Sequence, residues 1–351
     1  MTDFTPFLKQ MMSLAGLSAY EEPVRQLIAD AWRPLVDELS ISKLGSLHGL
    51  RRGSGPEPRR RLLLSAHMDA IGLIATVVDE GFIHFTQIGG VDPRILPGTP
   101  VMVHGRQSLP GIVVQPPDRL LPVSQREKPV AMEHLVVDTG LLPDDVSRLV
   151  RPGDLISFDS TPTELSGDTL SGHSLDNRSS VAAVTQCLQD LQHTSHAWDV
   201  WAVASTQEEN VLGGATTSPF EIRPDLAIII DVTHAKGPGV SDYRGYPLGK
   251  GPTIGLGPNL HPAGFKAMKD LAEKLEIPYS VEIMPTHSGT DAYAIQITES
   301  GIPCLVIGIP LRYMHTPVEL VSLKDVRRTG RLLSEFISGL QPEFFEQIIW
   351  D

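Results

Sequence analysis

Histidines and acidic residues follow several short apolar segments of this chain, at the point where each segment ends. The positions concerned are His67, Glu208, Glu209, Asp231 and His315. The apolar segments are typical of strands that are buried on both faces. Because the carboxyl ends of parallel strands meet at one edge of a sheet, where ligands bind, we expect these side chains to converge at that edge.

Asp176 can join this group from a loop, because it lies in the segment SLDNR just before a predicted helix that begins near Ser179. Two histidines and three carboxylates are the mixed nitrogen and oxygen ligands that suit Zn²⁺, Co²⁺ or Mn²⁺. Five ligands are more than one catalytic tetrahedral ion uses, but they suit two ions roughly 3.5–4 Å apart that share a carboxylate. The pattern predicts a hydrolase with two divalent ions per subunit, Zn²⁺ being expected first and Co²⁺ or Mn²⁺ being alternatives.

A two-metal hydrolase also needs a carboxylate that takes a proton from water. The adjacent Glu208 and Glu209 offer a metal ligand and a general base in one dipeptide. Asp69, two residues after His67, is expected to accept the other ring N–H of this histidine and thereby to fix its tautomer.

Each of these residues has an ordinary explanation when it is considered alone. A single histidine at a strand end is more often structural, adjacent glutamates usually face solvent, and Asp176 fits a helix cap. Asp231 is harder to explain in this way, because a carboxylate that ends an apolar strand is costly unless it is paired or bound to a metal. The metal site is favoured because all of these positions fall at the same edge of one predicted sheet.

The elements that must position these residues alternate between strands and helices. Apolar spacing predicts helices around residues 4–14 and 24–35, and three later helices whose stripes begin at Val181, Phe265 and Val326. The predicted buried strands are LLLSA (62–66), WDVWAVAS (198–205), LAIIID (226–231) and CLVIGI (304–309). This alternation predicts an α/β fold, a three-layer α/β/α sandwich with a largely parallel central sheet.

Residues 74–165 have a different pattern, with Gly and Pro every few residues, short apolar runs and no helical stripe of useful length. They are predicted to form a small inserted β-barrel-like domain. The catalytic α/β domain would then be discontinuous, comprising residues 1–73 and 166–351. The polar, basic stretch of residues 51–61 is predicted to be the solvated tip of a hairpin.

The composition excludes several classes of protein. The 351 residues are 41% hydrophobic and 20% charged, which is typical of a soluble globular chain. The net charge of −13 argues against nucleic acid or an anionic membrane surface as a main partner and favours a cationic or amine-bearing ligand. We expect a cytoplasmic protein with Cys187 and Cys304 reduced, because there is no apolar run of about 18 residues and no basic leader.

Several segments resemble, in order and spacing, the motifs of the tetrahedral (TET), deblocking and glutamyl aminopeptidase family, of which some members have been labelled cellulase M. The segments are SAHMDAIG (65–72), SLDNRSSVAAV (174–184), STQEENVLGGA (205–215), IIDVTHA (229–235), HSGTDA (287–292) and RYMHTPVE (312–319). Any one motif is weak evidence, but six in order along nearly the whole chain are specific.

The resemblance implies a role for each residue of the predicted site. His67 and Asp231 would hold one metal ion, while Glu209 and His315 would hold the second. Asp176 would bridge the two ions and Glu208 would be the general base. Asp69 matches the residue that orients the first histidine.

The resemblance has further structural implications. The inserted domain would be a dimerisation domain that helps dimers to assemble into a tetrahedral dodecamer. The Asp176–Asn177 peptide bond would be cis, which is costly for a non-proline bond and therefore usual only at functional sites.

The predicted function is that of a metal-dependent aminopeptidase acting on peptides with a free N-terminus. An N-deacylase or a carboxypeptidase with the same metal centre stays open as an alternative. A glycosidase is disfavoured, because consecutive Glu208 and Glu209 should point in different directions whereas glycosidase carboxylates face one bond about 5–10 Å apart. A scaffold with a vestigial site would lack a ligand or the base, and every such position is filled.

The preference for a particular substrate residue cannot be read from these motifs. The specificity pocket is expected to include the loop of residues 255–262 and the stretch around His287. Together with His287, His173 and His234 are candidates for contact with the site, because histidine is a common ligand and proton shuttle.

Overall fold

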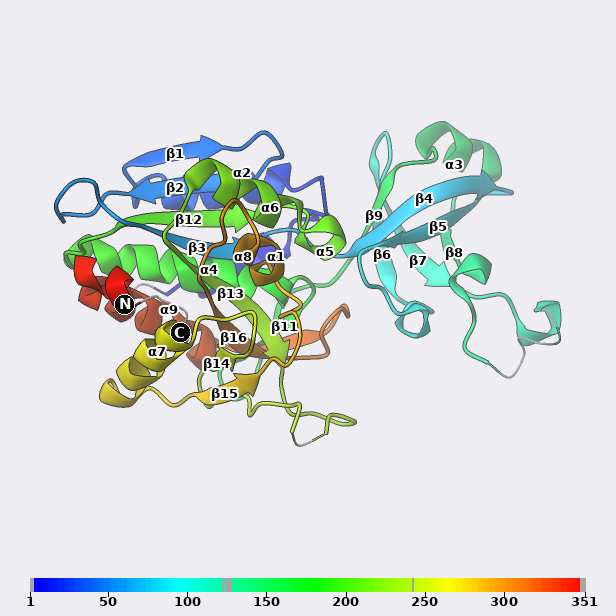
Figure 1. The fold of residues 1–351 in the computed structure, drawn as a ribbon. Helices are drawn as coiled ribbons and strands as arrows, with labels where there is room; N and C mark the ends of the chain where they lie inside the picture. The colour runs from blue at the N-terminus through cyan, green and yellow to red at the C-terminus, as the bar shows by residue number, and fades with distance from the viewer. Residues whose placement is uncertain (1–2, 122, 124–127, 242, 348–351) are drawn as a thin grey trace.

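The computed structural model describes residues 3–121, 123, 128–241 and 243–347. They form a larger α/β unit from which a smaller β barrel projects on one side (Figure 1). The α-helices of the described chain are α1 (Thr5–Met12), α2 (Glu22–Trp32), α3 (Pro143–Leu149), α4 (Leu175–Asp190), α5 (Glu208–Val211), α6 (Gly213–Ile222), α7 (Pro262–Lys274), α8 (Ala292–Gln296) and α9 (Leu323–Gly339). None of these helices is long and apolar enough to cross a membrane.

One sheet forms the centre of the larger unit. Its main path runs in the order β1 (Glu38–Ile41), β2 (Leu47–Arg51), β12 (Asp199–Ser205), β3 (Arg61–His67), β13 (Leu226–His234), β16 (Cys304–Arg312), β17 (Glu319–Ser322), β11 (Thr169–Gly172) and β10 (Thr163–Leu165). Beside this path, β14 (Thr253–Leu256) pairs with β16 and with β15 (Ser280–Ile283).

The predicted fold class is confirmed, with a distinction between the centre and the edges of the sheet. The central strands β12, β3, β13 and β16 are parallel, so their carboxyl ends lie at one edge. Towards both ends of the main path the pairing is antiparallel. The parallel strands are the apolar segments recognised in the sequence, because burial on both faces requires a continuous apolar run.

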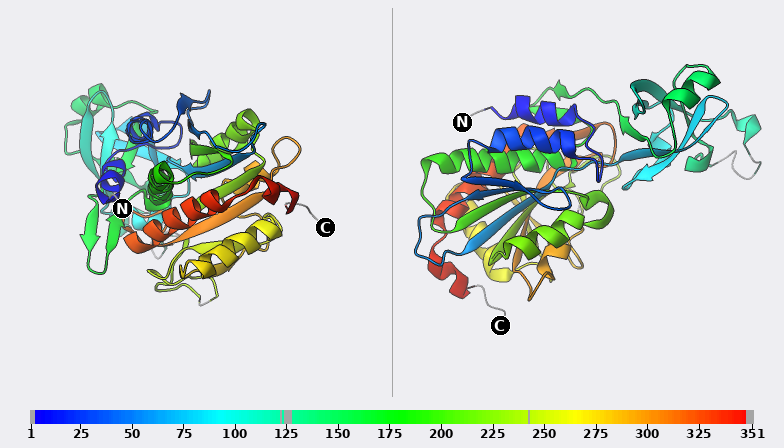
Figure 2. Two further views of the ribbon diagram at one scale, coloured as in Figure 1. Left: turned by 90° about the vertical axis from the view of Figure 1, so that its left-hand side faces the viewer. Right: turned by 90° about the horizontal axis from the view of Figure 1, so that it is seen from above.

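Strand β13 shows how the two faces are filled. Ile228 and Ile230 pack into the cluster formed with α1, α2, α4, α7 and α9, whereas Ala227 and Ile229 pack into the cluster formed with α6 and α8. Helices therefore cover both faces of the sheet (Figure 2). Cys187 and Cys304 are buried in these clusters as free thiols.

The smaller unit is a closed barrel. Its strands follow the order β4 (Gly72–Asp79), β5 (Phe82–Ile88), β8 (Val136–Asp138), β7 (Ser108–Val114), β6 (Pro100–His104) and β9 (Leu155–Phe158). The chain passes from sheet to barrel between His67 and Gly72 and returns between Phe158 and Thr163. The domain division at residues 73/74 and 165/166 stays a prediction.

The barrel segment also contains α3, which buries only Val146 and is too short to produce an apolar stripe in the sequence.

The expectation for residues 51–61 is wrong. The stretch of residues 51–61 is not a hairpin tip, because β12 lies between β2 and β3. It crosses the start of β12, where Arg59 pairs with Asp199 at 2.7 Å. A basic run does not show which strand lies next to it.

Arg178 is a fully buried cation on α4 that holds the N-terminal segment against the sheet. Its guanidinium donates to the carbonyl oxygens of Leu14 at 2.7 Å and Ala15 at 2.8 Å, and also to that of Met11. Burial lowers the pKa of Arg178 to about 10, so the side chain stays charged at neutral pH. The hydrogen bonds compensate for the loss of water around this charge.

We expect Arg178→Met to lower the free energy of unfolding by about 3 kcal/mol, because it leaves several buried carbonyl oxygens without a donor. The measurement is equilibrium urea unfolding followed by fluorescence. Arg331→Met, at an exposed position of α9, is the control and should change stability by less than about 0.5 kcal/mol. Equal effects of the two substitutions would show that the buried hydrogen bonds contribute no stability.

Candidate metal centre

The structure brings the predicted ligands together at the carboxyl edge of the parallel strands. His67 ends β3, Glu208 and Glu209 begin α5 directly after β12, and His315 follows β16. Asp231 lies on β13, which continues to His234 instead of ending at Asp231. Figure 1 shows α5 on the side of the larger unit that faces the barrel, so the site lies close to the junction of the two units.

Asp176 lies between the two histidines. Its Oδ1 atom is 3.1 Å from Nε2 of His67, and its Oδ2 atom is 3.4 Å from Nε2 of His315. The two oxygens of one carboxylate therefore face two different imidazoles. This is the arrangement that a carboxylate shared by two metal ions requires. The Asp176–Asn177 peptide bond is cis, as expected from the resemblance.

The remaining carboxylates surround the same two imidazoles. Nε2 of His67 lies 3.7 Å from Oε2 of Glu208 and 3.8 Å from Oδ1 of Asp231. Nε2 of His315 lies 3.3 Å from Oε2 of Glu209. Ligand atoms of His67, Glu208 and Asp231 lie within 4.8 Å of one another, as do those of His67, Asp176 and Glu209.

The chemistry of these donors fits divalent metal ions. Imidazole nitrogen and carboxylate oxygen together suit Zn²⁺, Co²⁺ and Mn²⁺. Burial raises the pKa values of Glu208, Glu209 and Asp231 well above their usual range. Burial also opposes ionisation of Asp176, but hydrogen bonds from His315 and His67 hold its pKa below the usual value. A cation among these carboxylates would offset both their desolvation and their mutual repulsion.

Asp69 supports both a ligand and the segment that carries the glutamates. Nδ1 of His67 lies 3.3 Å from the backbone carbonyl oxygen of Asp69 and 3.3 Å from its Oδ1 atom, so Asp69 can accept the ring N–H that faces away from Asp176. The same carboxylate accepts the backbone N–H groups of Glu208 at 3.1 Å and Glu209 at 3.2 Å. Asp69 therefore sets the distance between the end of β3 and the start of α5.

Glu208 and Glu209 do not lie in an extended segment, in which consecutive side chains would point to opposite sides. They lie in the short helix α5, which is bracketed by left-handed residues, Gln207 at φ 58° and Leu212 at φ 53°. Because of this helical turn, Glu208 approaches His67 while Glu209 approaches His315. Both carboxylates thus remain within one group.

Glu319 is a buried residue of the site to which the sequence analysis assigned no role. Its Oε1 atom accepts the backbone N–H of His315 at 3.0 Å, and its Oε2 atom accepts the backbone N–H of Asp176 at 3.2 Å. One carboxylate therefore fixes the backbone of two predicted ligands. The available signal was its position at the end of the motif RYMHTPVE, four residues after His315.

Asp291 is another buried acid that the sequence analysis did not single out. Its Oδ2 atom accepts the hydroxyls of Ser65 on β3 at 2.8 Å and Ser205 on β12 at 2.6 Å. It lies at the start of α8 and ties this helix to two of the strands that carry the site. The segment HSGTDA was recognised as a motif, but nothing in it indicates these partners.

The barrel also reaches the site. Gly90 lies in the loop after β5, and a β-carbon at this position would be 2.9 Å from Nδ1 of His315. The approach of the barrel backbone to this imidazole therefore depends on the absence of a side chain at Gly90.

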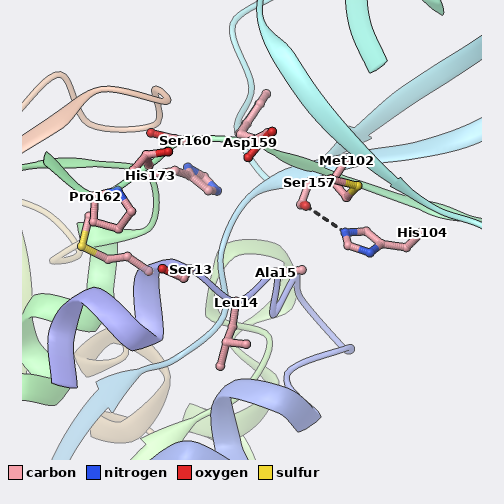
Figure 3. Close-up of a pocket in the computed structure, with 13 residues that line it drawn as sticks. Ser13, Leu14, Ala15, Met102, His104, Ser157, Asp159, Ser160, Pro162 and His173 are labelled. Atoms are coloured by element: carbon pink, nitrogen blue, oxygen red, sulfur yellow. Dashed lines mark hydrogen bonds between the residues drawn. The ribbon is translucent and has the colours of Figure 1, made fainter. Parts of the chain in front are cut away.

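The three additional candidate histidines do not join the predicted ligands. Within the described residues, no hydrogen bond or ion pair connects His173, His234 or His287 to them. His173 donates to the carbonyl oxygen of Ile71 at 3.2 Å, and burial lowers its pKa to about 4, so it is neutral. It lines a cavity of about 280 Å³ at the junction with the barrel, where His104 contacts Ser157 at 2.8 Å (Figure 3).

Glu319→Gln should weaken Zn²⁺ binding about 10-fold or more, because an amide nitrogen cannot accept one of the two backbone N–H groups. The affinity is measured by competition with a chromogenic chelator. Glu335→Gln removes an exposed carboxylate from α9 and should leave the affinity unchanged. Wild-type affinity in the Glu319 variant would mean that Glu319 does not position the ligands.

The chain is similar to known proteins in sequence and in fold. The profile of the M42 glutamyl aminopeptidase family matches residues 45–332. Lysyl aminopeptidase from Pyrococcus furiosus is 33% identical over 344 residues, which cover 96% of this chain and 98% of the relative.

Solved structures match the fold of this chain along nearly its whole length. TET aminopeptidase from a marine sediment archaeon of the Thaumarchaeota has a TM-score of 0.93 at 28% identity, with 98% of each chain covered. The TET1 peptidase of Pyrococcus horikoshii, described as able to assemble into a tetrahedron or a large octahedral shell, has a TM-score of 0.83 at 28% identity, with 96% of this chain and 100% of that chain covered. The expected resemblance is confirmed, and the chain belongs to the M42 glutamyl aminopeptidase family.

Proposed function

We propose that this protein is an aminopeptidase that releases N-terminal residues from peptides, with two divalent metal ions per subunit and Glu208 as the general base. The observation that carries the proposal is the position of Asp176, whose two oxygens face His67 and His315. Membership of the M42 family supports a hydrolase of the aminopeptidase class. The number of ions and the role of each residue are the proposed part.

The proposed ligands form two sets that share one residue. His67 and Asp231 would hold one ion, Glu209 and His315 would hold the other, and Asp176 would contribute to both. When bound, the ions supply positive charge that polarises the scissile carbonyl and makes water more acidic. Zn²⁺ is the ion that we expect first, with Co²⁺ or Mn²⁺ as alternatives.

Glu208 is the carboxylate that remains once these five ligands are assigned. It begins α5 beside the ligand Glu209 and lies 3.7 Å from His67, so it is within reach of water at the centre of the group. In the proposed reaction it accepts a proton from the attacking water and gives it to the leaving amine. Asp69 holds His67 and the start of α5 close together, because its carboxylate faces Nδ1 of His67 and accepts the backbone N–H of Glu208.

The assembly is proposed from the neighbours of the chain. A TET peptidase of similar fold is described as forming a tetrahedron. We propose that the barrel is a dimerisation domain and that dimers assemble into a dodecamer. A cytoplasmic location stays a prediction from the sequence.

The first experiment uses chelator-stripped protein, restored separately with Zn²⁺, Co²⁺ or Mn²⁺. A panel of aminoacyl chromogenic substrates is offered with free or acetylated N-termini. We expect cleavage of the free-amine set only, and only after a metal is restored. Cleavage of the acetylated set alone would favour a deacylase, C-terminal trimming of longer peptides would favour a carboxypeptidase, and no cleavage at all would contradict the proposed function.

Glu208→Gln should lower kcat by about 10²-fold or more while both metal ions are retained, because it removes the base and no proposed ligand. Turnover and metal content are measured on the same preparation. The neighbouring Glu209→Gln is the matched comparison and should lower metal content as well. A Glu208 variant that loses metal is evidence for a ligand instead of a base, and one with near-normal turnover would remove Glu208 from the reaction.

A further inference from the structure

Glu282 on β15 is an acidic residue that the proposed reaction does not use. Its Oε1 atom accepts the hydroxyl of Thr233 on β13, and its Oε2 atom accepts the hydroxyl of Thr253 on β14, both at 2.6 Å. Side chains from three strands therefore fix the position of this carboxylate. The side chain nevertheless remains partly exposed to solvent.

A glycine leaves the space that this carboxylate occupies. A β-carbon at Gly308 on β16 would lie 3.0 Å from Oε2 of Glu282 and 2.2 Å from Oγ1 of Thr253. Gly308 is the in-register partner of Asp231 on β13. In-register residues of parallel neighbours point to the same face, and such strands lie about 4.8 Å apart. The Glu282 carboxylate therefore lies on the same sheet face as the Asp231 side chain, beside the candidate metal centre.

Among the described residues, the Glu282 carboxylate accepts two threonine hydroxyls and forms no ion pair with a lysine or an arginine. Burial raises its pKa, while the two threonine hydroxyls and the nearby His234 lower it. Each carboxylate oxygen accepts one hydroxyl and keeps a lone pair for another donor. A cation that enters from solvent would offset the cost of holding this carboxylate in a partly buried position.

Tyr246, whose backbone forms a bridge with Ala235 directly after β13, lies near Glu282. Burial and the charge of Glu282 both raise the pKa of Tyr246, which also hydrogen-bonds the backbone of Ile283. Aromatic rings attract cations and pack against hydrocarbon stems. An aromatic side chain near the carboxylate is compatible with a ligand that has an apolar stem and a positively charged end.

We propose that Glu282 forms a subsite for a basic side chain, that of a lysine or arginine at the N-terminus of the substrate. This inference rests on the proposed aminopeptidase function, because it places the scissile carbonyl at the site that includes Asp231. Thr233, whose hydroxyl donates to Glu282, lies two residues beyond Asp231 on β13, roughly 6.6 Å along the strand. The four-carbon stem of lysine and the stem of arginine are of comparable length. An acidic substrate residue would meet a like charge there, so the subsite disfavours it.

The test compares wild-type metal-loaded protein with Glu282→Gln on lysyl and norleucyl p-nitroanilides. The two substrates carry the same α-ammonium group and stems of similar length, and they differ in the charge at the end of the side chain. Wild-type protein should prefer the lysyl substrate. The variant should lower kcat/KM for the lysyl substrate at least about tenfold and change that for the norleucyl substrate less than about threefold. Glu335→Gln removes a surface charge of the same sign and should change neither value.

A selective loss with the lysyl substrate supports the subsite. Equal losses with both substrates would assign Glu282 to the α-ammonium group or to the integrity of the site, and an unchanged ratio or a wild-type enzyme without preference for lysine would overturn the proposal. If wild-type protein cleaves the norleucyl substrate without such a preference, only the subsite is refuted. If it cleaves no free-amine substrate, the proposed function fails and the subsite with it.

Discussion

The position of Asp176 between two imidazoles is the constraint on which the rest of the site depends. Its two oxygens lie 3.1 Å from His67 and 3.4 Å from His315, and these histidines come from distant segments of the chain. Several buried groups serve mainly to keep this arrangement. Glu319 holds the backbone of Asp176 and His315, while Asp69 joins His67 to the start of α5. Small changes in any of these supports would separate the two imidazoles from their shared carboxylate.

Apart from Asp291, which accepts two serine hydroxyls, the buried acids of the site differ in their surroundings. The carboxylates of Asp69 and Glu319 each accept two backbone N–H groups, and such hydrogen bonds stabilise the ionised form without a metal. The carboxylates of Glu208, Glu209, Asp176 and Asp231 surround the imidazoles, and Asp231 also accepts the backbone N–H of Val232. If ionised, these four carry a charge of −4, which two divalent cations would balance. This supports the proposal of two ions over one.

The sequence predicted the strands and the edge of the site because both depend on local patterns. A strand buried on both faces must be apolar along its length, so the ends of such runs locate His67 and Asp231. The prediction of a hairpin at residues 51–61 was wrong, because the sequence of this stretch does not determine which strands are neighbours in the sheet. Glu319 and Asp291 were missed for the same reason. Glu319 bonds the backbone N–H of distant Asp176 as well as that of His315, and Asp291 bonds two distant serines, which no periodicity indicates.

The contrast between Glu319 and Glu282 shows how the surroundings of a glutamate determine what it can do. Glu319 is 1% exposed, and both of its oxygens accept backbone N–H groups, so it is closed to a ligand. Among the described residues, the donors to Glu282 are rotatable threonine hydroxyls, and the side chain is partly exposed, so its carboxylate stays accessible. A hydroxyl can also turn towards another acceptor, whereas a backbone N–H cannot. The same residue type therefore anchors the backbone at one position, while at the other it can exchange its protein partners for a cationic ligand.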